Sequence, residues 1–172
     1  MAKTMRDASP MDAALAYLEA KPRTAREVAD RLDALHFGEG DVDATVARLK
    51  ELGLVDDARY AADFVSSRLS NKPVSRRKLR EQLYGHRLPA EDIESALETV
   101  DDAAEAANAL SVAEKYARQF AALDEAERKR RVMKRLVGRG FMFDASKAAL
   151  EKLFGDAEGL DAVGEEDDDD ED

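Results

Sequence analysis

The sequence predicts an all-α protein, an elongated and curved tandem array of three three-helix repeats. Two observations carry this prediction. First, Lys21-Pro22-Arg23-Thr24 is followed 51 residues later by Lys72-Pro73-Val74-Ser75, and apolar positions recur at the same offset. Second, the apolar residues are spaced as in helices, and we find no convincing stretch with the two-residue period of a strand. A fixed period of this kind is typical of stacked helical units, which form extended concave surfaces.

The first predicted repeat covers residues 11–57. Its first helix ends near Pro22, because the residue before a proline is disfavoured in the α region. Thr24 and Glu27 match a capping box, which begins the second helix. Asp41 or a neighbour is expected to cap the third helix. The residues expected to face inward in the second and third helices are Val28, Leu32, Leu35, Val42, Val46, Leu49 and Leu52.

The junction between the first two repeats is the most informative stretch. Gly53 can adopt the left-handed backbone conformation that ends a helix. Leu54 and Val55 follow it and are expected to pack beneath this end. Asp56 or Asp57 then offers a carboxylate to the free N–H groups at the start of the next helix.

The second repeat is predicted at residues 58–102 and the third at 103–155. The apolar pairs that share the offset are Val28 with Leu79, Leu32 with Leu83, Phe37 with Leu88, Val42 with Ile93, and Val46 with Leu97. In the third repeat, Val132, Leu136, Phe141 and Leu150 keep the same intervals of 4, 5 and 9. Asp124 is predicted to cap a middle helix about one turn longer than its counterparts.

Composition excludes several classes of function. The chain of 172 residues has no cysteine and only two isolated histidines, so thiolate metal sites and clustered histidine ligands are excluded. No apolar run approaches the roughly 20 residues that span a bilayer. Residues 1–10 lack the apolar core of a signal peptide and are predicted to be disordered. No phosphate-binding glycine loop or catalytic triad is recognisable. We therefore expect a cytoplasmic protein that is not an enzyme and has no cofactor and no membrane partner.

The formal net charge of -11 is unevenly distributed. Residues 165–172 are all acidic and contribute -8, so residues 1–164 carry only -3. We predict that residues 156–172 form a disordered acidic tail. Three interpretations of the tail remain open: an inert solubilising segment, which composition favours, a DNA mimic that occupies basic clusters of the same chain, or a contact to another partner.

Three motifs give the sequence a resemblance to a known family. These are Gly53-Leu54-Val55-Asp56-Asp57 followed by Tyr60-Ala61, the basic segment Arg76-Arg77-Lys78-Leu79, and the turn Arg139-Gly140-Phe141. The junction and the turn resemble those of the RecX family, modulators of the RecA recombinase, and the resemblance covers about residues 11–155. The segment around Asn71-Lys72-Pro73, the position of the turn glycine in the second repeat, and the acidic tail depart from the family pattern.

Basic residues cluster on the middle helices of the second and third repeats, where Arg can donate two parallel hydrogen bonds to a phosphate or a carboxylate. In the second repeat, Arg76, Arg80 and Arg87 are expected to share one outward side. In the third, Arg128, Arg131 and Arg135 form one outward stripe, with Arg130 and Lys134 in another. The predicted partner- and DNA-binding residues are Arg68, Lys72, Arg76, Arg77, Lys78, Arg80, Arg87, Arg128, Arg131, Lys134, Arg135 and Arg139. The alternative is that these are merely solvated helix faces.

The resemblance implies one function, and the charge pattern allows another. RecX-like proteins lie in the helical groove of the RecA–DNA filament and restrain its growth, its ATPase activity and strand exchange, in DNA repair and SOS control. For this chain the resemblance therefore implies a mainly negative modulator that binds the RecA filament, binds single- or double-stranded DNA weakly, and is a monomer. The alternative is a general DNA-binding helical protein that needs no recombinase partner.

Overall fold

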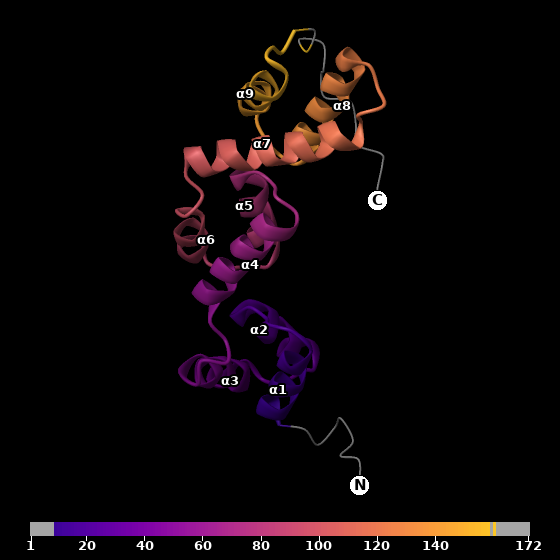
Figure 1. Cartoon of the computed structure of the whole chain (residues 1–172). Coiled ribbons are helices and arrows are strands. Elements are labelled where there is room, and N and C mark those ends of the chain that lie inside the picture. Colours follow the sequence, from indigo (N-terminus) through magenta and orange to yellow (C-terminus); the bar gives the residue numbers. More distant parts are fainter. Residues whose placement is uncertain (1–8, 159, 161–172) are drawn as a thin grey trace. The chain divides into compact units, whose positions relative to one another are not determined.

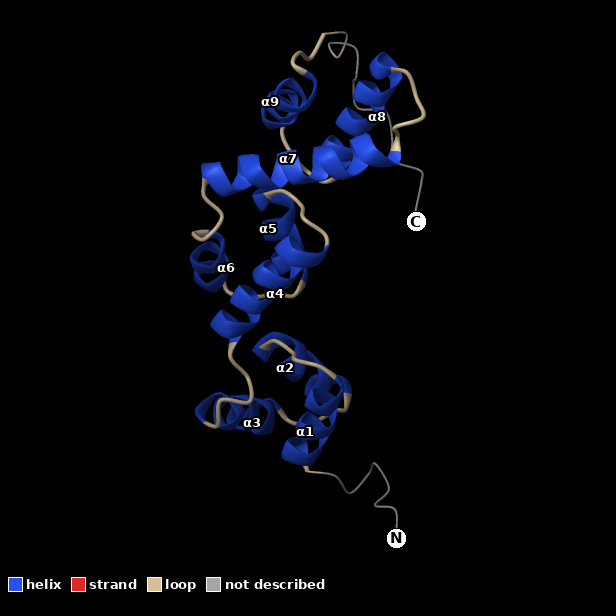
Figure 2. Cartoon of the chain, viewed as in Figure 1, coloured by secondary structure: helices blue, strands red, loops and turns tan. Residues whose placement is uncertain are grey.

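The computed structural model describes residues 9–158 and 160. Every regular element within that part of the chain is a helix, as predicted, and the nine helices fall into three groups of three (Figures 1 and 2). Their bounds are α1 Pro10–Ala20, α2 Ala25–Ala34, α3 Glu39–Glu51, α4 Asp57–Asn71, α5 Arg76–Gly85, α6 Ala90–Leu97, α7 Asp102–Gln119, α8 Glu125–Gly138 and α9 Phe143–Phe154. Residues 1–8 and 161–172, which hold most of the predicted disordered termini, lie outside the described residues.

The chain forms two compact units that do not coincide with the repeats. The described part of the first unit contains residues 9–64 and 82–96. That of the second contains residues 65–81, 97–158 and 160. The middle repeat is therefore divided, because α4 begins in the first unit and ends in the second, and α5 does the reverse. The curvature of the array stays a prediction.

The first unit is built on the amphipathic stripes that the sequence predicts. Its core cluster consists of Ala14, Ala25, Val28, Leu32, Val42, Leu49 and Val55. Two predicted inward residues are misplaced, since Leu52 and Leu54 are each 50% exposed. Leu52 is the C-cap of α3, one residue beyond the end of the helix, so it lies outside the last buried turn. Helix α3 also begins two residues before Asp41, and Gly38 precedes it without a side-chain cap.

At the junction after α3, Gly53 ends the helix as predicted, and the two aspartates cap different helices. Gly53 has a φ of 68°, in the left-handed region. The Asp56 side chain accepts a hydrogen bond of 2.9 Å from the Arg59 amide and so caps α4. Asp57 accepts instead from the backbone amide of Ala25, at 2.8 Å. One aspartate therefore caps its own helix, and the next caps the start of α2.

In the second unit, α7, α8 and α9 enclose the larger core. Its buried members are Ala109, Val112, Ala113, Tyr116, Val132, Met133, Leu136, Phe141, Ala149, Leu150 and Leu160. Asp124 caps α8 through the Glu127 amide at 3.0 Å, as predicted. Leu160 is only 1% exposed. Residues 156–158 and 160, which we assigned to the acidic tail, therefore include a residue of the folded core.

The turn between the second and third helix of each repeat has one backbone geometry. The residue with positive φ is His36 in the first repeat (64°), Arg87 in the second (58°) and Gly140 in the third (85°). His36 and Arg87 are separated by the 51-residue offset that the sequence shows. Phe37 and Phe141, which follow two of these turns, each donate a backbone hydrogen bond to the carbonyl five residues earlier. The internal repeat is thus present in backbone conformation and not only in residue type.

Candidate functional site

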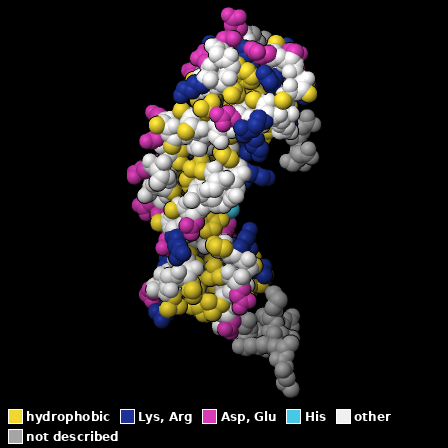
Figure 3. Space-filling view, in the orientation of Figure 1, with side chains coloured by type: hydrophobic (Ala, Val, Ile, Leu, Met, Phe, Trp, Pro, Cys, Tyr) yellow, Lys and Arg dark blue, Asp and Glu magenta, His cyan; other side chains and the backbone are white. Residues whose placement is uncertain are grey.

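Helix α8 presents an exposed basic surface in the second unit. Its buried side is apolar, with Val132, Met133 and Leu136 fully buried. The helical period then turns the intervening residues toward solvent. The exposed cations are Arg130, Arg131, Lys134 and Arg135. Figure 3 shows dark blue Lys and Arg side chains on the part of the molecule that carries α7 and α8.

Several of these cations remain available to a ligand. Arg131 pairs with Glu127 at 3.0 Å and Arg130 approaches the same carboxylate at 3.9 Å, and all three side chains are solvent-accessible. Exposed ion pairs contribute little free energy, so a stronger anion can displace them. Lys134 and Arg135 have no ion pair within the described chain. The Arg135 guanidinium lies 5.6 Å from the centre of the Tyr116 ring, which positions it without neutralising it.

Two basic residues of the same helix are held inside the fold. Arg128, predicted to face outward with Arg131, lies with its guanidinium 5.1 Å from the centre of the Phe154 ring, and its Nε is buried. Lys129 is 5% exposed and pairs with Asp156 at 2.5 Å and with Glu125 at 2.9 Å. The hydrogen bond to Asp156, with that to Glu125, raises the pKa of Lys129. The same hydrogen bond from Lys129, with one from a backbone amide, lowers the pKa of Asp156.

The two basic clusters, far apart in sequence, meet in the second unit at the α8–α9 turn. The Ser75 amide donates to the Arg139 carbonyl oxygen at 3.0 Å. The Arg139 guanidinium donates to the Pro73 carbonyl oxygen at 3.4 Å and to the Tyr116 hydroxyl at 2.9 Å. A Cβ on Gly140 would lie 2.9 Å from Cβ of Lys78. The segment that begins α5 is therefore packed directly on the segment that ends α8.

Of the first cluster, Arg76 has a structural role. Its guanidinium donates to the Val100 carbonyl oxygen at 3.0 Å and pairs with Asp102 at 3.0 Å. Lys72 and Arg77 are exposed, and Lys78 is half-buried with a 4.0 Å pair to Glu81. The half-buried Arg68 and Arg80 also interact with other residues. The structure thus leaves Lys72 and Arg77 as the exposed, unpaired members of this cluster among the described residues.

Arg87 does not belong with Arg76 and Arg80 on one helix face. It lies in the left-handed turn after α5 and belongs to the first unit, where it pairs with Asp30 at 2.9 Å. The prediction that Arg87 continues the outward side of α5 is wrong, because α5 ends at Gly85. In the third repeat a glycine, Gly140, takes the left-handed conformation of the turn, whereas in the second repeat Arg87 takes it. An arginine at a left-handed position is not a recognisable sequence signal for the end of a helix.

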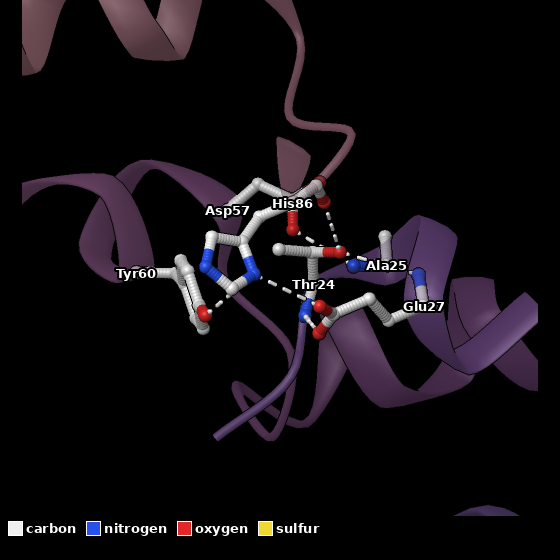
Figure 4. Close-up of polar contacts among 6 residues, drawn as sticks. All are labelled: Thr24, Ala25, Glu27, Asp57, Tyr60 and His86. Atoms are coloured by element: carbon white, nitrogen blue, oxygen red, sulfur yellow. Dashed lines mark hydrogen bonds and ion pairs between the residues drawn. The ribbon is translucent and has the colours of Figure 1, made fainter. Parts of the chain in front are cut away.

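The predicted capping box at the start of α2 is part of a larger polar cluster, whose contacts to His86 and Tyr60 the sequence did not predict (Figure 4). Thr24 accepts from the Glu27 amide at 3.2 Å, and its hydroxyl donates to the His86 carbonyl oxygen at 3.0 Å. The His86 Nδ1 lies 3.0 Å from the Glu27 carboxylate and 3.2 Å from the Tyr60 hydroxyl. Burial, followed by the charge of Glu27, raises the pKa of Tyr60. The cluster joins the first repeat to the second within the first unit.

The second unit repeats this construction with different residues. Ser75 stands at the offset of Thr24 and caps α5 through the Lys78 amide at 3.1 Å. A carboxylate of the following repeat, from Glu105, accepts from the Arg76 amide at 2.9 Å, as Asp57 does in the first unit. Arg139 precedes the left-handed residue of its turn, as His86 does, and its guanidinium likewise bonds to a tyrosine hydroxyl, that of Tyr116. Each junction therefore places a turn and a carboxylate of one repeat on the middle helix of the preceding one.

Comparison with known proteins finds three three-helix domains in the chain. Three family models match in order: RecX, first three-helix domain, at residues 11–49; second three-helix domain at 56–97; and third three-helix domain at 103–160. A protein of Mycobacterium marinum, "Regulatory protein RecX", is 37% identical over 128 residues, which are 74% of each chain. The chain belongs to the RecX family.

Other RecX proteins agree with this assignment over more of the chain. A regulatory protein RecX of Chlorobium phaeobacteroides is 28% identical over 148 residues, 86% of this chain and 95% of its own. The crystal structure of RecX from Lactobacillus salivarius has a TM-score of 0.73 at 24% identity, over 84% of this chain and 94% of that one. The latter shows a common fold. RecX family membership confirms the prediction of a regulatory protein that is not an enzyme.

Two structural findings are relevant to other classes of site. No helix of the described residues is long and apolar enough to cross a membrane. The described part of the chain also contains no group of three or more His, Cys, Asp and Glu side chains that could hold a metal ion.

Proposed function

We propose that this RecX-family chain is a mainly negative modulator of the RecA recombinase. In this proposal it binds in the helical groove of the RecA–DNA filament and restrains filament extension, ATPase activity and strand exchange, and so acts in DNA repair and SOS control. The observation that carries the proposal is the junction of the two basic clusters at the α8–α9 turn, in a chain that matches all three RecX domains.

The chemistry of the surface fits a filament made of protein and DNA. Arg131, Lys134 and Arg135 are exposed, and each can pair with a carboxylate or with a phosphate. Charge of this kind steers the encounter and fixes the register between partners. Only -3 of formal charge remains on residues 1–164, so this basic surface acts locally and the body as a whole is no general polycation.

A charge-reversal variant tests the proposed surface. We expect Arg131→Glu, Lys134→Glu and Arg135→Glu together to abolish inhibition of the DNA-dependent ATPase of RecA. The matched control reverses three exposed cations of the first unit, Lys21, Arg48 and Arg59, and changes the net charge equally. Inhibition by the control should match that of the unaltered chain. Equal loss in both variants would assign the effect to net charge and overturn the proposed surface.

A second candidate is a general DNA-binding protein with no recombinase partner, because the same exposed cations suit phosphates. Stoichiometry separates the two. A filament regulator inhibits at concentrations well below that of RecA protomers, whereas a protein that only competes for DNA inhibits when it saturates the DNA. A pull-down with RecA, with and without DNA and nucleotide, provides the second criterion.

A further inference from the structure

The chain leaves the folded core against the buried side of α8, the helix whose opposite side carries the exposed cations. Asp156 forms an ion pair with Lys129 of that helix, and Leu160 belongs to the same core cluster as Val132, Met133 and Leu136. These contacts fix the point from which the rest of the chain extends. Only four residues, 161–164, separate Leu160 from the acidic run 165–172.

The segment after Leu160 is long enough to pass around α8, whose diameter with side chains is about 10–12 Å, and to lie along its exposed side. Five extended residues from Leu160 to Glu165 span at most about 17 Å, and the eight acidic residues add at most about 27 Å. Helix α8 has 14 residues, which corresponds to a length of about 21 Å. The acidic run can therefore lie along most of the helix to which it is tethered.

The charges of the helix and of the run are complementary. The exposed cations of α8 are Arg130, Arg131, Lys134 and Arg135, and the only carboxylate of described residues that pairs with them is Glu127. Eight adjacent carboxylates repel one another, and cations that approach them relieve that repulsion. A tether of a few residues also gives an effective concentration in the millimolar range, so even weak pairing is populated.

We propose that Glu165–Asp172 docks on the exposed basic face of α8 in the same chain and competes there with other polyanions. The acidic run is then an intramolecular competitor that sets a threshold for partner binding. A free run with a millimolar Kd, at a millimolar effective concentration, would weaken binding of an external polyanion roughly two- to tenfold at low salt. Although the basic face is that of the proposed function, the docking itself requires no recombinase.

A paramagnetic label tests the docking directly. The chain has no cysteine, so Asp170→Cys gives one attachment site for a nitroxide. We expect loss of amide signal intensity along α8 at low ionic strength, and recovery at high salt because ions screen the pairing. The matched control carries the same label on a run in which the other acids of 165–172 are changed to Gln and Asn. Helix α2, which also carries basic residues, is the internal reference.

Three results would overturn the proposal. The first is equal intensity along α8 for the acidic and the neutral run. The second is signal loss that persists when Arg131, Lys134 and Arg135 are changed to Gln. The third is the same signal loss along α8 when nitroxide-labelled chain without ¹⁵N is mixed with ¹⁵N chain that carries no nitroxide. This result would place the run on a second copy.

A binding measurement provides the functional counterpart. We expect removal of residues 165–172 to raise the affinity for single-stranded DNA at low salt by roughly two- to tenfold, since a competitor at millimolar effective concentration is lost. Unchanged affinity would contradict competition. Failure of RecA inhibition with intact signal loss along α8 would instead overturn only the proposed function, so the two hypotheses are separable.

Discussion

Gly140→Ala probes the junction of the two basic clusters. Gly140 has a φ of 85°, and a Cβ there would lie 2.6 Å from the Ser75 hydroxyl and 2.9 Å from Cβ of Lys78. The substitution therefore introduces two costs. One is the left-handed backbone, which disfavours any residue with a β-carbon. The other is a clash with the segment that begins α5.

The size of the effect follows from these two terms. A left-handed conformation costs about 1–2 kcal/mol in a residue other than glycine. Overpacking of a well-packed contact costs typically about 1–3 kcal/mol. The lower entropy of the unfolded alanine variant offsets about 0.4–1 kcal/mol. We therefore expect the second unit to lose about 2–4 kcal/mol of unfolding free energy.

Gly53→Ala is the matched control, because Gly53 has a φ of 68° and a Cβ at this position would have no atom within 4 Å. It carries the backbone cost alone, about 1 kcal/mol. Urea unfolding followed by circular dichroism measures both variants, and hydrogen exchange at the Ser75 amide reports the junction itself. Equal losses of unfolding free energy in the two variants would refute the close contact of the α8–α9 turn with α5.

Three further changes test other parts of the fold. Asp57→Ala should cost about 1 kcal/mol in urea unfolding, because the start of α2 loses an accepting carboxylate; no loss would contradict this cap. His36→Gly should stabilise the chain by about 0.5–1 kcal/mol, because it relieves a left-handed residue, and a lower urea midpoint would be the contrary result. The hydrogen bonds of Asp156 lower its pKa, so its stabilisation is present above the ordinary aspartate range and is lost as pH falls below about 4. The difference in urea midpoint between the unaltered chain and Asp156→Asn should therefore be present at pH 7 and disappear in acid, whereas a pH-independent difference would exclude this ion pair as its cause.

Helix ends and caps were predictable where a single residue type determines them. Gly53 ends α3 in the left-handed conformation, and the Thr24–Glu27 capping box forms as expected. Their chemistry acts within one turn of helix, so neighbouring sequence suffices to predict it. The buried positions of α2 and α8 followed from periodicity for the same reason.

The wrong predictions concern residues that keep the spacing of a helix but lie beyond its end, or that have a partner far away in the sequence. Leu52 keeps the apolar spacing of α3 but lies at its exposed end. Arg87 keeps the basic spacing of α5 but lies in the next turn. In the sequence Lys129 is one more cation of a basic run, yet it is buried and forms an ion pair with Asp156, 27 residues away. Periodicity gives the direction of a side chain but not the length of its helix or the identity of a distant partner.

The sequence by itself determined the helical class, the three-fold repeat and the location of the basic residues, because composition, caps and periodicity are local properties of the chain. Only the tertiary structure decided which cations are exposed and which are engaged in the fold. It also showed that Asp57 and Glu105 cap helices of the preceding repeat, and that Gly140 joins the two basic clusters. These are contacts between residues far apart in sequence, and they depend on how one repeat packs on the next.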